Sequence, residues 1–411
     1  METLSARCCI AGGGPAGMML GFLLARAGID VVVLEKHADF LRDFRGDTVH
    51  PSTLELMYEL WLLDAFLKRP HQEVVQLFGI IGGTTVPVAD FSHLHTHCKF
   101  IALMPQWDFL NFLAESGRRY PTFRVMMRTE VTGLIDAGAR IAGVRATTPD
   151  GPVEIRADLV VGADGRHSIV RERAGLSVHD IGAPIDVLWM RLPKRPGDPS
   201  GAVLGRFDAG KILVALDRGD YWQCASVIPK GGYDALRARG LQALRDDIAA
   251  VAPDLADRVG ALRSWDDVKL LTVTVDRLRE WYRPGLLCIG DAAHAMSPIG
   301  GVGINLAIQD AVAAANMLFE PLRHGAPSVR DLAAVQRRRM LPVRLTQAMQ
   351  VLIQNRVITS VLADTKPTKV PWPLKLVLAV PFLRRIPARV VGVGFRPEHV
   401  RTPQVATPRS A

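Results

Sequence analysis

Hydrophobic and polar residues follow two different periods within the first 35 positions of the chain. Residues 7–11 form a short apolar run that ends at three consecutive glycines, and apolar side chains then recur at helical spacing from residue 16 to residue 27. Gly28 ends this pattern, and the unbroken apolar run from Val31 to Leu34 is typical of a buried parallel strand. This stretch therefore predicts a strand, a tight turn, a helix and a second strand.

The glycines of the turn have the spacing of a dinucleotide-binding site. They fall as Gly12-x-Gly14-x-x-Gly17, Pro15 suits the first turn of the helix, and Glu35 closes the second strand. Gly12 permits the turn, Gly14 lets a pyrophosphate approach the backbone, and Gly17 lets helix and strand pack closely. The acid can accept hydrogen bonds from a ribose. The alternative is a purely structural glycine turn, and this stretch alone does not distinguish NAD from FAD.

The pattern beyond residue 35 predicts further strands and helices in two groups. A helix is expected after residue 50, with Ser52 and Glu55 as its capping box. Residues 123–162 alternate between strand and turn, residues 180–275 are rich in strands, and a buried strand at 286–289 precedes helices that begin near residues 303 and 328. We therefore expect an α/β protein with one domain of residues 1–180 and 276–345. A smaller, β-sheet-rich domain is expected at 181–275, joined by strands from about 74–103, and a helical, basic C-terminal segment at 346–411.

Length and composition are those of an ordinary globular protein. The 411 residues suffice for about two domains, and 48% of them are hydrophobic and 22% charged. No apolar run approaches the roughly 20 residues that span a bilayer, and the first apolar run lacks the features of a signal peptide. The five cysteines show neither CxxC nor metal-ligand spacing. We therefore expect a cytoplasmic, reducing setting and no metal.

The net charge of +9 is concentrated near the C-terminus. From Lys366 onward the chain has nine basic residues and one acid, so this part carries +8. The sequence shows no basic, aromatic-bearing face that would indicate binding to nucleic acid. Residues 371–391 mix apolar and basic side chains, which leaves two interpretations open. Either they make a peripheral contact with an anionic membrane, or they pack over the nucleotide-binding domain with their basic residues exposed.

Two further motifs follow predicted strands and bear on the choice of cofactor. The first begins Gly162-Ala163-Asp164-Gly165, and the second runs from Gly290-Asp291 through Pro298-Ile-Gly-Gly-Val-Gly to Asn305. With all three motifs in order, the chain resembles the FAD-dependent aromatic hydroxylases, which are single-component flavoprotein monooxygenases of the para-hydroxybenzoate hydroxylase type. The resemblance covers roughly residues 5–345. It implies an α/β fold with a Rossmann-like FAD-binding domain of the GR2 type, a β-rich substrate domain and a helical C-terminal segment.

The loop of the last motif suits a flat ring on physical grounds. Its glycines carry no side-chain bulk, and the helix that starts near Gly303 directs its N-terminal N–H groups and positive dipole end at the ring, which favours an anionic reduced flavin. The carboxylate of Asp291 can accept a hydrogen bond from a ribityl hydroxyl. The cofactor-binding candidates, several of them implied by the resemblance, are Gly12, Gly14, Pro15, Ala16, Gly17, Glu35, Lys36, Arg45, Gln106, Asp164, Gly165, Gly290, Asp291, Pro298, Gly301, Gly303, Ile304 and Asn305.

The reaction implied by the resemblance is the insertion of one oxygen atom of O₂. NADPH or NADH, bound transiently because no second GxGxxG unit is present, would reduce FAD. A flavin C4a-hydroperoxide would then hydroxylate or epoxidise an aromatic, polycyclic or quinone-like small molecule. The alternatives are a reductase of prenyl double bonds, similar to geranylgeranyl reductases, and a flavin-bound protein that associates with membranes without turnover. A halogenase is less favoured because a Trp-x-Trp-x-Ile-Pro motif is missing from the sequence.

The sequence identifies the side chains around the substrate less clearly. Trp189, Tyr221 and Gln223 lie on predicted strands where the family places the floor of its substrate cavity, and Tyr221 and Gln223 share one strand face. Packing in the core is the alternative for them. No catalytic base can be named. His50 is a candidate that would face the flavin or a phenolic substrate, and a structural histidine is the alternative.

Overall fold

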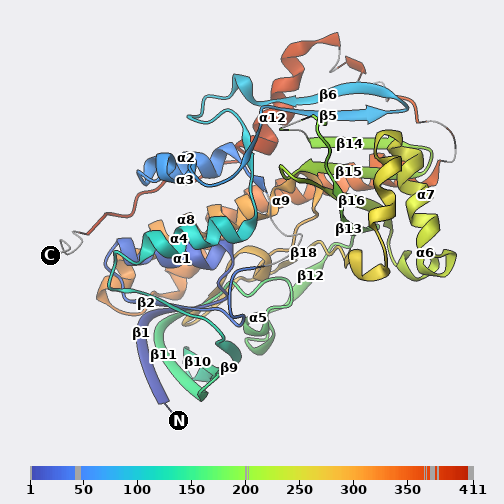
Figure 1. Ribbon diagram of the computed structural model, residues 1–411. Helices are drawn as coiled ribbons and strands as arrows, with labels where there is room; N and C mark the ends of the chain where they lie inside the picture. Colours follow the sequence, from blue (N-terminus) through green and yellow to red (C-terminus); the bar gives the residue numbers. More distant parts are fainter. Residues whose placement is uncertain are drawn as a thin grey trace.

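The computed structural model describes residues 2–41, 48–199, 201, 203–364, 366, 368–370, 375–376 and 379–405. Two large sheets lie in different parts of the molecule, and helices pack between and around them (Figure 1). This arrangement is the α/β architecture that the hydrophobic pattern predicts.

The first sheet has eight strands and a parallel centre. The order of its parallel strands is β20 (Leu286–Cys288), β11 (Gly151–Gly162), β1 (Glu2–Ala11), β2 (Val31–Leu34) and β8 (Phe123–Met126). Antiparallel strands complete it, namely β19 (Tyr282–Arg283) beside β20, and β10 (Ile141–Thr148) and β9 (Glu130–Asp136) beyond β11. β1, β2, β11 and β20 are buried in the part of the sheet where all four lie side by side, and their residues there are apolar.

Three helices pack together and build the core with this sheet. α1 (Pro15–Arg26) contacts both α8 (Gly303–His324) and α4 (Gln106–Gly117) (Figure 1). The stretch Ile299–His324 is long and apolar enough to cross a membrane by length and composition, with a mean hydropathy of 1.4. However, 72% of its apolar window is buried inside the protein, as expected for a core helix.

The second sheet has seven strands, and two helices cover one of its faces. The strand order is β17 (Lys269–Leu271), β13 (Ile185–Pro193), β16 (Tyr221–Pro229), β15 (Lys211–Asp217), β14 (Val203–Asp208), β5 (Gln76–Ile81) and β6 (Thr84–Asp90). Alternate residues of β13 and β16, such as Leu188 and Trp222, pack against α6 (Tyr233–Arg239) and α7 (Leu241–Val251). β5 and β6 thus come from the stretch that the sequence assigns to this sheet.

Two small sheets join the larger parts. β12 (Val178–Asp180) pairs with β18 (Asp276–Leu278), at the two points where the chain passes between the large sheets. β7 (Ile101–Leu103) pairs with both β3 (Thr48–Val49) and β4 (Gln72–Val74). The short helices are α2 (Pro51–Glu59), α3 (Leu63–Phe66) and α5 (Ile169–Arg173).

The predicted capping box of α2 is wrong. The helix begins at Pro51, which suits the first helical position, and His50 takes the N-cap position without a side-chain cap. Ser52 therefore lies inside the helix. Glu55 instead accepts hydrogen bonds from the main-chain N and the ring Nδ1 of His97, at 3.0 and 2.9 Å.

The described part of the C-terminal segment packs over the protein. α9 (Val329–Ile353) passes into a π-helical turn, Gln354–Ile358, and then into α10 (Thr359–Ala363). α12 (Arg385–Gly392) contacts β6, and the residues that follow run along the helices of the first sheet, where Val405 N donates to Arg26 O at 2.9 Å. α12 thus packs against the second sheet, whereas residues 396–405 lie along the helices of the first sheet. Residues 371–374 and 377–378 of the basic segment lie outside the described residues.

Candidate active site

The glycine turn between β1 and α1 is sterically determined on one side and open on the other. Gly12 has φ +105°, and a Cβ atom there would lie 2.4 Å from the carbonyl oxygen of Ala163. A Cβ on Gly17 would lie 2.0 Å from the carbonyl oxygen of Gly12. Gly14, the N-cap residue of α1, has φ −74° and would place a Cβ in open space, with no atom within 4 Å. Its lack of a side chain therefore serves an approach from outside.

Glu35 lies directly beside this turn. Its side chain is buried, with Oε2 accepting a hydrogen bond from Gly13 N at 3.2 Å and Oε1 accepting one from His37 N at 3.0 Å. Lys36, the next residue, is exposed. Pro15 and Ala16 form the first turn of α1. Arg45 lies outside the described residues.

The Asp164-Gly165 motif adjoins the glycine turn because Ala163 N donates to Ala11 O at 2.8 Å. Asp164 accepts a hydrogen bond from Val170 N through Oδ2, at 3.2 Å, whereas its Oδ1 is buried and has no hydrogen-bond partner among the described residues. Burial raises the pKa of Asp164, although hydrogen bonds to the carboxylate oppose the effect. Gly165 has φ +86° and, like Gly14, faces open space.

The Gly290-Asp291 motif follows the third parallel strand of the same sheet edge. Ile289 N donates to Gly162 O at 2.9 Å, so this motif lies next to the previous one. Asp291 forms an ion pair with Arg166, with 3.6 Å between its Oδ2 and the guanidinium. All three motifs thus meet at the carboxyl ends of β1, β11 and β20, where ligands bind in open α/β sheets.

The loop from Pro298 to Gly303 leads into α8 and is held close to β3. Gly300 and Gly301 have φ of +77° and +63°, and a Cβ on Gly301 would lie 2.5 Å from Thr48 Oγ1. That hydroxyl donates to Gly301 O at 3.0 Å. Gly303 opens α8, and Ile304 is buried behind it.

Both polar atoms of the Asn305 side chain form hydrogen bonds within the protein. Its Oδ1 accepts hydrogen bonds from His50 N and Thr53 Oγ1, at 2.9 and 2.8 Å. Its Nδ2 donates to the carbonyl oxygens of Thr48 and Gly301, at 3.1 and 3.3 Å. The side chain therefore ties the loop to the start of α2, and in this arrangement it acts on the loop rather than pointing a free amide at a ligand. Gln106 is half-buried at the first position of α4, which packs on α1.

His50 is fully buried between the first sheet's helices and the C-terminal segment. Its Nδ1 lies 2.7 Å from the carbonyl oxygen of Val391 in α12, and its Nε2 is buried without a hydrogen-bond partner among the described residues. Burial lowers the pKa of His50 to about 4, so the ring is neutral. A carbonyl oxygen only accepts, so Nδ1 carries the proton and Nε2 is left as an acceptor.

The substrate candidates share one face of the second sheet. The antiparallel register of β13 and β16 pairs Trp189 with Ala225 and Arg191 with Gln223, so these residues and Tyr221 point to the side opposite α6 and α7. Trp189 packs against the same apolar cluster as Ile299 of the Pro298–Gly303 loop. Tyr221 and Gln223 lie farther along the sheet, with the Arg191 guanidinium 4.9 Å from the Tyr221 ring. Gln223 is buried and accepts a hydrogen bond from Arg218 Nε at 3.0 Å.

A buried charge network behind the Gly290 motif did not emerge from the sequence. Asp310 of α8 accepts hydrogen bonds from Gly290 N at 3.1 Å and Arg339 Nε at 2.9 Å, and it pairs with His294. Burial alone would raise the pKa of Asp310, but the charges and hydrogen bonds of His294 and Arg339 lower it. Arg339 also pairs with Glu398 at 3.2 Å. The signal of this network in the sequence is Asp310, an acid that interrupts the apolar pattern of α8.

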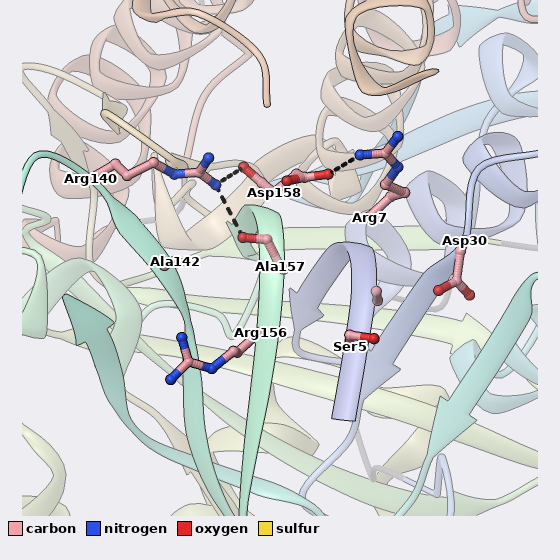
Figure 2. Close-up of a pocket in the computed structure, with 9 residues that line it drawn as sticks. Ser5, Arg7, Asp30, Arg140, Ala142, Arg156, Ala157 and Asp158 are labelled. Carbon is pink, nitrogen blue, oxygen red and sulfur yellow. Dashed lines mark hydrogen bonds and ion pairs between the residues drawn. The ribbon is translucent and has the colours of Figure 1, made fainter. Parts of the chain in front are cut away.

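An open hollow of about 610 Å³ lies elsewhere, near the amino ends of the parallel strands (Figure 2). Two of the three arginines that line it have protein partners, since Arg7 pairs with Asp158 and Arg140 donates to the carbonyl oxygens of Ala157 and Asp158, and Arg156 is the third. The three motifs are at the opposite strand ends, so this hollow does not belong to the candidate site. Within the part of the chain that the structure describes, no group of three or more His, Cys, Asp or Glu side chains could hold a metal ion.

The residues at the motif edge fit FAD. The open turn at Gly14 and the helix dipole of α1 suit a pyrophosphate, and the unpartnered Oδ1 of Asp164 suits a hydroxyl donor. The Pro298–Gly303 loop and the N-terminus of α8 suit the isoalloxazine ring. When bound, FAD would supply hydride acceptance and the activation of O₂.

Comparisons with known proteins agree with this assignment. Residues 5–348 match the family model described as FAD binding domain, and the chain belongs to this family. It is 37% identical over 356 residues to 6-methylpretetramide 4-monooxygenase of Streptomyces rimosus, which covers 86% of this chain and 84% of that protein. It is 29% identical over 360 residues to 12-dehydrotetracycline 5-monooxygenase/anhydrotetracycline 6-monooxygenase of Streptomyces rimosus, covering 84% of this chain and 69% of that protein.

A solved structure agrees in fold. A probable FAD-dependent monooxygenase from Pseudomonas aeruginosa superimposes with a TM-score of 0.73 at 25% identity, covering 87% of this chain and 97% of that one. The chain is an FAD-dependent monooxygenase, so the predicted family, fold class and cofactor are confirmed. These relatives do not favour the prenyl reductase or the non-turnover protein.

Proposed function

We propose that this monooxygenase transfers one oxygen atom of O₂ to a polycyclic aromatic compound, with NADPH or NADH as the electron donor. The observation that carries the proposal is the convergence of three motifs on one edge of the first sheet, with an open turn at Gly14 and an unpartnered carboxylate oxygen on Asp164. The names of two relatives, which refer to a pretetramide and to tetracyclines, support a fused-ring substrate.

The cofactor roles proposed here follow the order of the motifs. Gly12 to Gly17 would receive the pyrophosphate, and Glu35 would bind the ribose after exchanging its hydrogen bond with Gly13 N. Asp164, Gly165 and Asp291 would bind hydroxyl groups of the cofactor. The loop from Pro298 to Gly303 would lie against the ring, and Asn305 would hold that loop in place. Lys36, Arg45 and Gln106 remain proposed FAD contacts from the family resemblance.

For the substrate side, we place the ring system between the Pro298–Gly303 loop and the face of β13 and β16 that lies opposite α6 and α7. Trp189 shares an apolar cluster with Ile299 of that loop, which supports its role as a wall of the site. Neutral His50, with a lone pair on Nε2, would accept a hydrogen bond from a phenol or enol hydroxyl. Tyr221 and Gln223 would contact the far end of a large substrate.

The division into an FAD-binding domain of residues 1–180 and 276–345 and a substrate domain of 181–275 with strands from 74–103 is part of this proposal. The two large sheets support it. A cytoplasmic location also belongs to the proposal, by analogy with biosynthetic relatives. We do not propose a membrane contact for the basic segment, because the relatives give it no support and because Val391 and residues 396–405 make hydrogen bonds to the helices of the first sheet and the residues beside them.

The test is turnover by the purified protein. Apoprotein is loaded with FAD, and fused-ring phenols and quinones are screened for stimulation of NADPH and NADH oxidation. The proposal expects stimulation only with O₂ present, together with a product that has gained one oxygen atom. Equal consumption of reductant without O₂ would instead support a reductase, and failure to bind FAD would overturn the proposal.

A further inference from the structure

Three glutamines lie on one side of α9 and at its C-terminal end, facing the interior of the protein. Gln347, Gln350 and Gln354 are three and four positions apart, so they stack along a single helix face. Their exposed fractions are 1%, 0% and 0%. Amides are rarely buried to this extent without a role for their hydrogen-bonding groups.

The central glutamine, Gln350, forms hydrogen bonds with both the N–H and the C=O groups of a main-chain segment, as a neighbouring strand would. Gln350 accepts a hydrogen bond from Ser297 N through Oε1, at 3.2 Å. Its Nε2 donates to the carbonyl oxygens of Ser297 and Ile299, at 2.9 and 3.0 Å. One side chain therefore satisfies three main-chain groups of the segment.

The two outer glutamines hold the same segment at its ends. Gln347 Nε2 donates to Ala295 O at 3.1 Å and to Asp276 O at 2.7 Å. Gln354 Nε2 donates to the hydroxyl of Ser297 at 2.9 Å. We call Gln347, Gln350 and Gln354 the glutamine ladder.

The segment needs these partners because it is buried yet belongs to no strand. Residues 295–297 connect the Gly290-Asp291 motif to the loop at Pro298, and Ala295 and Ser297 are buried. Asp276 of β18 bonds to both main-chain groups of Ala295, at 3.3 and 3.2 Å, but Ser297 lies beyond the reach of that strand. Buried main-chain groups without partners are costly, so at Ser297 Gln350 supplies the bonds that a neighbouring strand would give. The position of the following loop is thereby set from α9.

The end of the ladder coincides with an interruption of the helix. Gln354 begins the π-helical turn, and Thr359 Oγ1 donates to its carbonyl oxygen at 2.9 Å. Beyond the turn, Ile358 and Val361 pack into the apolar cluster that also contacts Ile299 and Trp189. π-helical turns of this kind are common at functional sites. α9 and the turn that follows it thus contact both the start of the Pro298–Gly303 loop and the apolar cluster that includes Trp189.

We propose that the glutamine ladder is a positioning device that sets the Pro298–Gly303 loop against the flavin ring from α9. The proposal rests on the proposed function, because it requires that this loop faces the flavin. Replacing one of these glutamines would let the loop move and would change the surroundings of the flavin ring. The reduced enzyme would then pass electrons to O₂ without hydroxylating the substrate. The glutamines act through the loop and are positioning residues.

The test compares Gln350→Met with Gln336→Met. Gln336 lies on the same helix and makes the same kind of clasp, with Trp281 N and Arg279 O at 3.1 and 2.8 Å, but on a segment away from the loop. Both variants should lose thermal stability, Gln350→Met more than Gln336→Met, because Gln350 is fully buried and makes three such bonds while Gln336 is partly exposed and makes two. Only Gln350→Met should shift the visible spectrum of bound flavin and raise the share of NAD(P)H oxidation that ends as H₂O₂. Gln354→Met should do the same to a smaller degree.

A second measurement separates this inference from the proposed function. Hydrogen exchange of the Ser297 amide, followed in the protein without FAD, should be about tenfold faster or more in Gln350→Met, as loss of one hydrogen bond implies, and unchanged in Gln336→Met. If exchange of the Ser297 amide is faster but the protein binds no FAD, the proposed function is wrong, whereas the hydrogen bonding of the segment by Gln350 is confirmed. The inference is overturned if both variants leave the flavin spectrum and the H₂O₂ share at wild-type values.

Discussion

Replacing Gly14 by aspartate should separate the binding of FAD from folding. Gly14 has an extended backbone conformation that any residue adopts, and a Cβ there meets no atom within 4 Å. It is also the N-cap residue of α1, where aspartate is favoured and where a negative charge interacts well with the helix dipole. The apoprotein should therefore keep its stability or gain roughly 0.5 kcal/mol.

The same change should weaken FAD binding strongly. A carboxylate about 5 Å from a phosphate charge, at an effective dielectric constant of about 20, is repelled by roughly 3 kcal/mol. That corresponds to a Kd more than about a hundredfold higher. Titration of the apoprotein with FAD, followed by flavin fluorescence, measures the affinity, and thermal unfolding of the apoprotein measures stability.

Gly17→Ala is the matched comparison, because its Cβ would lie 2.0 Å from the carbonyl oxygen of Gly12. It should destabilise the apoprotein itself, whereas Gly14→Asp should not. If Gly14→Asp binds FAD with the wild-type Kd, the pyrophosphate does not lie at this turn and the reasoning is refuted.

Three further substitutions test the surroundings of the site. Burial lowers the pKa of His50 from 6.5 to about 4, so the free energy of unfolding should fall by roughly 3 kcal/mol as the pH drops from 6.5 towards 4. His50→Gln should lack this part of the pH dependence in urea unfolding, and identical pH profiles of the two proteins would contradict the prediction. Arg339→Met breaks a fully buried ion pair and should lower the free energy of unfolding by roughly 3 kcal/mol. The Arg338 side chain is 23% exposed, so Arg338→Met should cost less than about 1 kcal/mol. Equal losses in the two variants would contradict the buried network. Gly301 has φ +63°, and a Cβ there would lie 2.5 Å from Thr48 Oγ1, so Gly301→Ala should lower the free energy of unfolding by roughly 1 kcal/mol or more and perturb the flavin spectrum. Adding Thr48→Ala should restore part of the stability and part of the spectrum. If Gly301→Ala changes neither, the loop is not held as tightly as the structure shows.

The features that could be predicted from the sequence are those that depend on a few consecutive residues. Gly12, Gly14 and Gly17 act through local turn geometry, and each motif follows a strand whose apolar pattern is visible. Parallel strands bring their carboxyl ends to one edge, so the meeting of the three motifs also followed from the pattern.

The features that escaped prediction depend on contacts between distant parts of the chain. The tautomer of His50 is set by Val391, which is 341 positions away. The amide of Asn305 bonds to the main chain of His50 and Thr48, which are 255 and 257 positions away. The glutamines of α9 carry no motif, because their partners are main-chain groups that any sequence provides.

Oxygen transfer from O₂ is the central claim, and isotopic labelling tests it most directly. The FAD-loaded protein is incubated with NAD(P)H, labelled O₂ and the fused-ring compound that best stimulates oxidation of the reductant. The account predicts a product that carries one labelled oxygen atom and no product in the absence of O₂. A product formed anaerobically, or one whose new oxygen comes from water, would contradict it.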